Sequence, residues 1–290
     1  MLEHLLTEAQ PPSRVVVIGS TGFVGGAITK RLARDNVPFL PLGRAKLDLL
    51  APDAGARLRA LLAPGDAVVT AAAIAPCKDT AMLVDNMRIV AALVAGLAGA
   101  PISHVVNISS DAVYADEPVP LTEESAAAPT SLHGAMHLAR EIALRSVLNV
   151  PLATLRPTLI YGRADPHNGY GPNRFRRLAA AGDEIVLFGE GEERRDHVAI
   201  DDVAEIAVRI LMRKSRGVLN VASGDVYSFR AVAEMAVALA PTPVPIRSTP
   251  RNGPMPHNGY RPFDSRATRA AFPDFRYTPL QEGLRHAAVS

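Results

Sequence analysis

The feature that most constrains the fold is a glycine-rich turn, Gly19–Gly25, between a strand-like and a helix-like segment. The β-branched run Val15–Ile18 ends at the first glycine, and helix-spaced apolar residues follow from Phe23 to Leu32. In this G-x-x-G-x-x-G spacing, the glycines permit a tight turn, a close approach of a diphosphate to the backbone, and close packing of the helix on the strand. The N-terminus of the helix also favours negative charge. The turn therefore predicts a dinucleotide site formed by Gly19, Ser20, Thr21, Gly22, Phe23, Val24 and Gly25.

Short buried runs alternate with helical patterns and predict a parallel sheet. Runs at 67–73, 105–109 and 152–155 are separated by helical patterns at 82–97 and 132–148. Right-handed crossovers between such runs cover a sheet with helices on both faces. Glycine and proline become frequent after Pro157, where a second module begins, and the runs at 198–200 and 218–221 are expected to return to the first sheet.

We therefore expect an α/β fold, a Rossmann doubly wound parallel sheet with a smaller C-terminal α/β substrate domain. The predicted nucleotide-binding domain comprises residues 13–165 and 196–222. The predicted substrate-binding domain comprises residues 166–195 and 223–290. The proline-rich stretch 241–262 is expected to be an ordered but irregular loop.

Charge and cysteine content limit the partners and the compartment. The 31 Lys and Arg against 29 Asp and Glu give a net charge of +2, which is too even for nucleic acid or a membrane surface as a general partner. The single cysteine, Cys77, excludes an internal disulfide framework and fits a reducing compartment. With neither a secretory signal pattern nor an apolar run near the ~20 residues of a membrane span, the chain is expected to be soluble and cytoplasmic, with residues 1–12 as a loose leader.

The residue after the second predicted strand bears on the choice of nicotinamide cofactor. An acidic residue near the end of this strand usually binds a free ribose 2′-hydroxyl. Here Phe39–Leu42 is followed by Gly43 and Arg44, and an arginine can pair with a 2′-phosphate. The sequence therefore favours NADP over NAD, with a solvated loop arginine as the alternative.

Longer motifs, spread over nearly the whole chain, resemble those of the extended short-chain dehydrogenase/reductases, which include nucleotide-sugar epimerases, dehydratases and reductases. The resemblance is carried by the segments Leu47–Leu49, Ala71–Ala73, Val106–Tyr114, Arg156–Gly162 and Arg195–Ala204. The first of these and Ser110–Val113 are most similar to dTDP-4-dehydrorhamnose reductases. The segment from Arg195 is more like the epimerases, so the choice of subfamily stays open.

The resemblance implies a role for particular residues. Cofactor contacts are implied at Asp48, Leu49, Ala71, Ala72, Ala73, Ser109 and Pro157. Arg195 is implied to bind the diphosphate of a nucleotide sugar, which suits the paired donors of a guanidinium. The other implied substrate-binding residues are Ser110, Asp111, Tyr161 and Asn173. A homodimer formed through two helices is a further implication of the resemblance.

One departure from the family concerns catalysis. The family carries Tyr-x-x-x-Lys on the helix after the active-site strand, and this chain has His133 and His137 at those places. In one interpretation His133 is the general acid/base, with an ordinary pKa near ~6.5, assisted by Ser110 or Asp111, while His137 positions the cofactor ribose. In a second, catalysis is lost and the fold binds a nucleotide or a partner. In a third the two histidines hold a metal, but no third ligand is evident, and no metal is expected.

A short segment recurs within the chain. The sequence Pro-His-Asn-Gly-Tyr occurs at 166–170 and again at 256–260. Two turns of similar chemistry explain the echo most simply. The alternative is that both loops flank the substrate, with Tyr170 and Tyr260 contributing to its binding.

Overall fold

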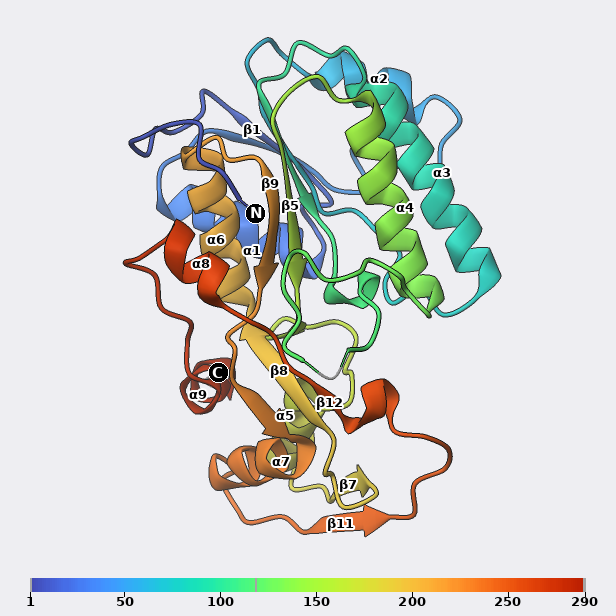
Figure 1. The fold of residues 1–290 in the computed structure, drawn as a ribbon, viewed down its shortest axis with the longest axis vertical. Helices are drawn as coiled ribbons and strands as arrows, with labels where there is room; N and C mark the ends of the chain where they lie inside the picture. The colour runs from blue at the N-terminus through green and yellow to red at the C-terminus, as the bar shows by residue number, and fades with distance from the viewer. Residues whose placement is uncertain (1, 118, 289–290) are drawn as a thin grey trace.

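A six-stranded parallel sheet organises the larger part of the molecule (Figure 1). The computed structural model describes residues 2–117 and 119–288. The strand order is β2-β1-β3-β4-β5-β9. The strands are β1 (Val15–Ile18), β2 (Phe39–Leu42), β3 (Ala67–Thr70), β4 (His104–Ile108), β5 (Leu152–Pro157) and β9 (Gly217–Val221). The order reverses between β1 and β3, which is where doubly wound sheets open a crevice at their carboxyl ends.

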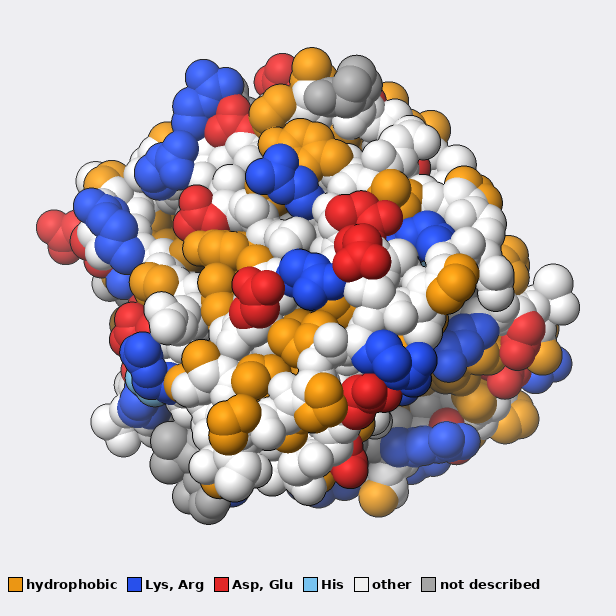
Figure 2. Space-filling view, turned by 90° about the horizontal axis from the view of Figure 1, so that it is seen from below, with side chains coloured by type: hydrophobic (Ala, Val, Ile, Leu, Met, Phe, Trp, Pro, Cys, Tyr) orange, Lys and Arg blue, Asp and Glu red, His pale blue; other side chains and the backbone are white. Residues whose placement is uncertain are grey.

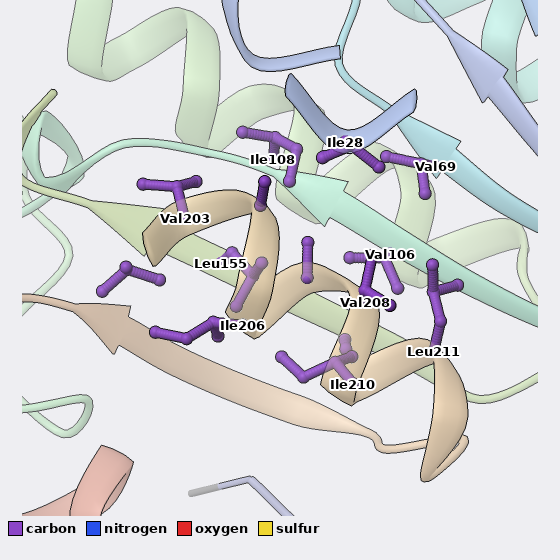
Figure 3. Packing of buried hydrophobic residues seen from close by; sticks show 14 of the residues in the cluster. Ile28, Val69, Val106, Ile108, Leu155, Val203, Ile206, Val208, Ile210 and Leu211 are labelled. Carbon is purple, nitrogen blue, oxygen red and sulfur yellow. The ribbon is translucent and has the colours of Figure 1, made fainter. Parts of the chain in front are cut away.

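Helices cover both faces of this sheet. One face carries α1 (Phe23–Arg34) and α6 (Ile200–Met212), and the other carries α2 (Ala54–Leu61), α3 (Thr80–Leu97) and α4 (Leu132–Val147) (Figure 1). Figure 3 shows α6 directing Val203, Ile206 and Ile210 toward Val106 and Leu155 of the sheet. These side chains are fully buried, so the β-branched strands are apolar on both faces. The predicted doubly wound α/β fold is confirmed.

The helix α3 corrects one expectation from the sequence. Of the described part of the chain, this helix alone is long and apolar enough to cross a membrane, with a mean hydropathy of 1.5 over 18 residues. It lies between α2 and α4. Ile89, Leu93 and Leu97 on its inner side pack in the core under the sheet, which accounts for part of its apolar composition.

A second module stands below the carboxyl ends of the parallel strands (Figure 1). Its central strand is β8 (Arg194–Ala199), which pairs with β6 (Leu159–Tyr161), β10 (Val226–Ser228) and β12 (Tyr260–Arg261). A separate core forms against α5 (Pro172–Ala181), α7 (Phe229–Ala238) and α9 (Leu280–Ala288). Figure 2 shows acidic and basic side chains interspersed over this end of the molecule, in keeping with the even charge balance.

The proline-rich stretch 241–262 is more regular than expected. It contains the strand β11 (Ile246–Thr249), the 3-10 helix η2 (Pro256–Gly259) and β12. The four residues of β11 are free of proline, so their backbone can pair with β7 (Ile185–Phe188).

The two ends of the described chain return to the larger module. After α8 (Arg266–Ala271), Phe272 and Phe275 join the core under α1 and α6. At the other end, Glu3 exchanges backbone hydrogen bonds with Arg216, so the leader is bound rather than loose. Hydropathy patterns carry no signal for such backbone pairing. The proposed division into domains stays a prediction.

Candidate active site

The glycine turn has the geometry that a dinucleotide requires. Gly19 has a φ of +89°, and a Cβ there would lie 2.6 Å from the backbone nitrogen of Ala72. A Cβ on Gly25 would lie 2.2 Å from the Gly19 carbonyl oxygen. Gly22 begins α1 without a side-chain cap, which leaves the first backbone N–H groups of the helix available to an anion. The turn therefore fits the pyrophosphate of a nicotinamide dinucleotide.

The residues predicted for the adenosine end lie beside the end of β2. Leu49 is buried in the core, whereas the Arg44 side chain is 76% exposed. The Arg44 guanidinium lies 3.5 Å from the Asp48 carboxylate, which also accepts a hydrogen bond from the Leu50 N–H. Arg44 is thus accessible to a 2′-phosphate but already has an acidic neighbour.

A cavity of about 540 Å³ lies between the carboxyl ends of the parallel strands and the second module. It brings together residues from both predicted sites. Those lining it are Gly22, Phe23, Val24, Ala71, Ala73, Ser109, Ser110, Asp111, His133, His137, Pro157, Asn173 and Arg195. Gly19, Ser20, Gly25, Arg44, Asp48, Leu49 and Ala72 are outside this lining.

Three further predicted residues also lie outside the lining of this cavity. Thr21 and Tyr161 line a second cavity of about 550 Å³ beside α1 and α9. Tyr260 is 41% exposed, with the Arg194 guanidinium 5.7 Å from its ring centre, and is absent from the lining of either cavity. These positions separate Tyr161 and Tyr260 from the other predicted substrate-binding residues.

The two copies of the repeated segment differ in position but share turn chemistry. The first copy, including Tyr170, lines the main cavity, and the second does not. Asn168 and Asn258 both adopt a positive φ, near 50°. Left-handed asparagines at equivalent places support the interpretation of two similar turns.

His133 faces the main cavity from the first turn of α4. The Ser131 hydroxyl caps this helix by accepting a hydrogen bond from the Gly134 N–H. The helix also lies close to the Ala112 carbonyl oxygen, because a Cβ on Gly134 would be only 2.0 Å from that oxygen. The Cys77 N–H donates to Nδ1 of His133 at 3.4 Å. Burial lowers the pKa of His133, and His167 adds to this effect, while Asp111 opposes it. These influences favour the neutral ring at pH 7, with its hydrogen on Nε2.

His137 lies one turn further along α4. Its ring meets the ring of His133 edge-on, with 4.7 Å between the two ring centres. It is 6% exposed, and its Nδ1 has no hydrogen-bond partner among the described residues. Burial, followed by the charges of Arg140 and His133, holds its pKa well below 6.5. The position at which the resemblance implies a lysine is therefore expected to carry a neutral side chain.

Ser110 and Asp111 begin a 3-10 turn, η1 (Asp111–Val113), at the end of β4. The Ser110 hydroxyl accepts a hydrogen bond from the Ala112 N–H at 3.1 Å and donates to the Asp111 carboxylate at 3.3 Å. The other oxygen of this carboxylate lies 3.4 Å from Nε of Arg261, in a buried ion pair. Asp111 is thus engaged with an arginine that the sequence interpretation did not single out.

Arg195, on β8, also lines the cavity. Its guanidinium is 3.1 Å from the buried carboxylate of Glu193, and its side chain is 11% exposed. Asn173 instead hydrogen-bonds the backbone at the end of β6. Its amide oxygen accepts from the Gly162 N–H at 3.0 Å, and its amide nitrogen donates to the Ile160 carbonyl at 3.3 Å. Of these two predicted substrate-binding residues, Arg195 carries the positive charge that binding an anion requires, whereas the Asn173 amide already bonds to the backbone.

The sequence interpretation missed a buried polar network beneath the site. Glu141 of α4 pairs with Arg156 of β5 at 2.6 Å and accepts from the Ser109 hydroxyl at 2.5 Å. Arg140 is 1% exposed and donates to the Thr70 and Ile108 carbonyls, which ties together the ends of β3 and β4. The sequence signal for this network was the presence of charged residues, Arg140, Glu141 and Arg156, inside otherwise apolar segments. His197, whose ring nitrogens find no partner in the described chain, also lines the cavity.

Within residues 2–117 and 119–288, no group of three or more His, Cys, Asp or Glu side chains is arranged to hold a metal ion.

Comparisons with known proteins agree with this geometry. A family model described as the NAD dependent epimerase/dehydratase family matches residues 15–222. A UDP-glucose 4-epimerase from Mycolicibacterium smegmatis is 31% identical over 230 residues, covering 68% of this chain and 72% of that protein. A dTDP-4-dehydrorhamnose reductase from Sinorhizobium fredii is 30% identical over 240 residues, covering 76% of each chain.

Solved structures share the fold at lower identity. A GDP-L-fucose synthetase from Naegleria fowleri bound to NADP has a TM-score of 0.83 and 16% identity, over 99% of this chain and 95% of that one. A UDP-glucose 4-epimerase from Thermotoga maritima with UDP-glucose has a TM-score of 0.82 and 18% identity, over 95% of this chain and 97% of that one.

Proposed function

This chain belongs to the NAD dependent epimerase/dehydratase family, and we propose that it is an NAD(P)-dependent enzyme acting on a nucleotide-activated sugar, as a 4-keto sugar reductase or an epimerase. The observation that carries this proposal is that Gly22–Val24 of the glycine turn, Ser110, His133 and Arg195 line one cavity of about 540 Å³. Both curated relatives described above are named as enzymes of nucleotide sugars.

The residues of the cofactor site have separable roles. Backbone groups of Gly19–Gly25 bind the pyrophosphate, and Ala71 and Ala73 line the floor toward Ser109 and Pro157. Arg44 favours a cofactor with a 2′-phosphate, so we place NADP ahead of NAD. When bound, the cofactor supplies or accepts a hydride.

Two residues of the cavity lining hold the substrate. Arg195 binds the diphosphate, and Ser110 hydrogen-bonds the sugar oxygen at the reacting carbon. Because the Cys77 amide favours hydrogen on Nε2, neutral His133 presents a donor that polarises this oxygen. Protonated His133 can deliver a proton outright, at the cost of the Cys77 contact.

The test is consumption of NADPH with a 4-keto nucleotide sugar, compared between the wild type and His133→Phe. We expect one NADPH oxidised per sugar reduced by the wild type, and loss of this activity in the variant. If calorimetry finds no uptake of NADPH or NADH, the proposed function is wrong.

A second candidate function is binding without catalysis. It is favoured by neutral His137 at the lysine position and by the ion pair that occupies Asp111. A protein of this kind binds both NADP and a nucleotide sugar but shows no hydride transfer, even over many hours with either 4-keto or 4-hydroxy sugars.

We further propose a cytoplasmic homodimer. The sole cysteine is buried and free, as suits a reducing compartment. We propose α3 and α4, which expose Val84 and Ile142 by 52% and 55%, as the two helices that contact a second copy. Light scattering is expected to give twice the chain mass, and the mass of one chain for the double variant Val84→Glu and Ile142→Glu. Cell fractionation tests the compartment.

A further inference from the structure

Arg261 links the second module to the turn that carries Ser110 and Asp111. It belongs to β12, where its partner in the strand register is Arg195 of β8. Its side chain is only 2% exposed, although the residue lies in the proline-rich stretch 241–262. A guanidinium buried to this degree requires hydrogen bonds and opposite charge on every side.

The hydrogen bonds of Arg261 reach both ends of η1. Nη2 of Arg261 donates to the Asp111 carbonyl at 2.8 Å and to the Tyr114 carbonyl at 3.3 Å. Asp111 is the first residue of η1 and Tyr114 directly follows its last. Nε also lies 3.4 Å from the Asp111 carboxylate, so one planar group holds both ends of a single turn.

The outer side of the guanidinium faces a second acidic residue. Nη1 contacts the Asp116 carboxylate and lies 3.0 Å from Nδ1 of His257. Asp111 and Asp116 together balance the buried charge. The same arginine therefore fixes the start of the loop that leaves the active-site strand.

The position of η1 determines the position of the reacting groups. Ser110 caps this turn through the Ala112 N–H, and α4 packs against the Ala112 carbonyl at Gly134, next to His133. A shift of η1 therefore moves the Ser110 hydroxyl relative to the ring of His133. Displacements of about 1 Å at such groups cost on the order of 10²-fold in rate.

We propose that Arg261 is a positioning residue, which holds the Ser110–Tyr114 turn in its active geometry and connects that turn to the substrate-binding strand at Arg195. Its kinetic consequence rests on the proposed function, whereas its effect on the turn does not. The two are therefore measured separately.

The first measurement is hydrogen exchange of the backbone amides of residues 110–116, in protein saturated with NADPH. In Arg261→Gln we expect exchange at least tenfold faster than in wild type. The matched control is Arg266→Gln, five residues away, which should leave these amides unchanged. The exposed Arg266 side chain pairs with Asp264 and with no other acidic side chain in the described part of the chain. Unchanged exchange in folded Arg261→Gln overturns the proposal.

The second measurement is turnover of the 4-keto nucleotide sugar. We expect kcat to fall on the order of 10²-fold in Arg261→Gln, with the NADPH dissociation constant within twofold of wild type. Added methylguanidinium should restore part of kcat in Arg261→Ala, which a general loss of packing would not allow. An unchanged kcat in an active, folded variant contradicts the positioning role.

Two further outcomes are informative. If Arg261→Gln does not fold, Arg261→Lys decides the matter, since lysine keeps the charge but cannot bridge both carbonyls. Its amides at 110–116 should exchange faster, and wild-type exchange there overturns the proposal. If wild type shows no turnover while exchange accelerates in the variant, the proposed function fails and the role of Arg261 in the turn stands.

Discussion

At the scale of single residues, the cavity is lined by two histidines from the start of α4, His133 and His137. Burial lowers the pKa of both His133 and His137, which we propose to stand in the places of the family's tyrosine and lysine. A neutral imidazole donates a hydrogen bond but carries no charge to stabilise a developing oxyanion. Under the proposed role of His133 as the proton donor, the balance between its neutral and protonated forms sets the rate of reduction.

The rate of sugar reduction is predicted to depend on this balance. A proton donor acts in its protonated form, and burial places the pKa of His133 below 6.5. We expect kcat for reduction to decline as pH rises through that pKa and to level off at the rate of the neutral form. The measurement is kcat from about pH 5 to 8.5, with deuterated NADPH to show that hydride transfer limits the rate.

The variant His133→Gln is the control for this profile. Glutamine can donate a hydrogen bond but does not titrate, so it should give a flat, low rate. A flat profile in wild type, with a full isotope effect, would remove His133 as the proton donor.

At the scale of elements, the β1 turn and α1 form a unit whose spacing depends on the glycines. The helix lies so close to the strand that Gly25 has no room for a methyl group, whereas Gly26 beside it does. A Cβ on Gly26 would have its nearest neighbour, the Ser20 carbonyl oxygen, at 3.5 Å. Two adjacent glycines thus provide a matched pair.

Gly25→Ala is predicted to weaken NADPH binding by at least 100-fold. The added methyl would lie 2.2 Å from the Gly19 carbonyl, so the turn or the helix must move away from its pyrophosphate-binding position. Gly26→Ala should bind NADPH within about threefold of wild type. Calorimetric titration measures both, and equal affinities for the two variants would contradict the proposed cofactor site.

At the scale of the whole molecule, burial of ionisable groups connects stability to pH. Burial lowers the pKa of His104 to about 4 and that of His197 to about 3. The folded protein therefore favours their neutral forms, while the unfolded chain titrates near 6.5. The stability that they contribute is present above that value and is lost as pH falls. Burial acts oppositely on Asp196 by raising its pKa to about 6.

The free energy of unfolding is therefore predicted to fall between pH 7.5 and pH 5. The two histidines each account for a loss of about 2 kcal/mol at pH 5, and Asp196 offsets about 1 kcal/mol of the total. Urea unfolding at the two pH values measures the change. His197→Phe should reduce the pH dependence, and an equal slope in this variant would assign the effect to other groups.

Local patterns were sufficient for much of the fold and part of the site. The runs at 15–18, 67–70 and 105–108 and the glycine turn each carry their signal within a few residues. Side-chain period and backbone sterics act over that range. For the same reason, the strand β11 within the proline-rich stretch was missed, because its partner β7 is distant in the sequence.

What the amino-acid sequence determined by itself is the strand, turn and helix around Gly19–Gly25, the alternation that builds a parallel sheet, and the two histidines on one face of α4. Only the tertiary structure decided that Arg261 would meet Asp111 across 150 positions, and that Tyr161 would lie outside the main cavity. The physical reason is that periodicity and glycine sterics act between near neighbours in the chain. Ion pairs, cavities and pKa values depend on which distant surfaces pack together and exclude water.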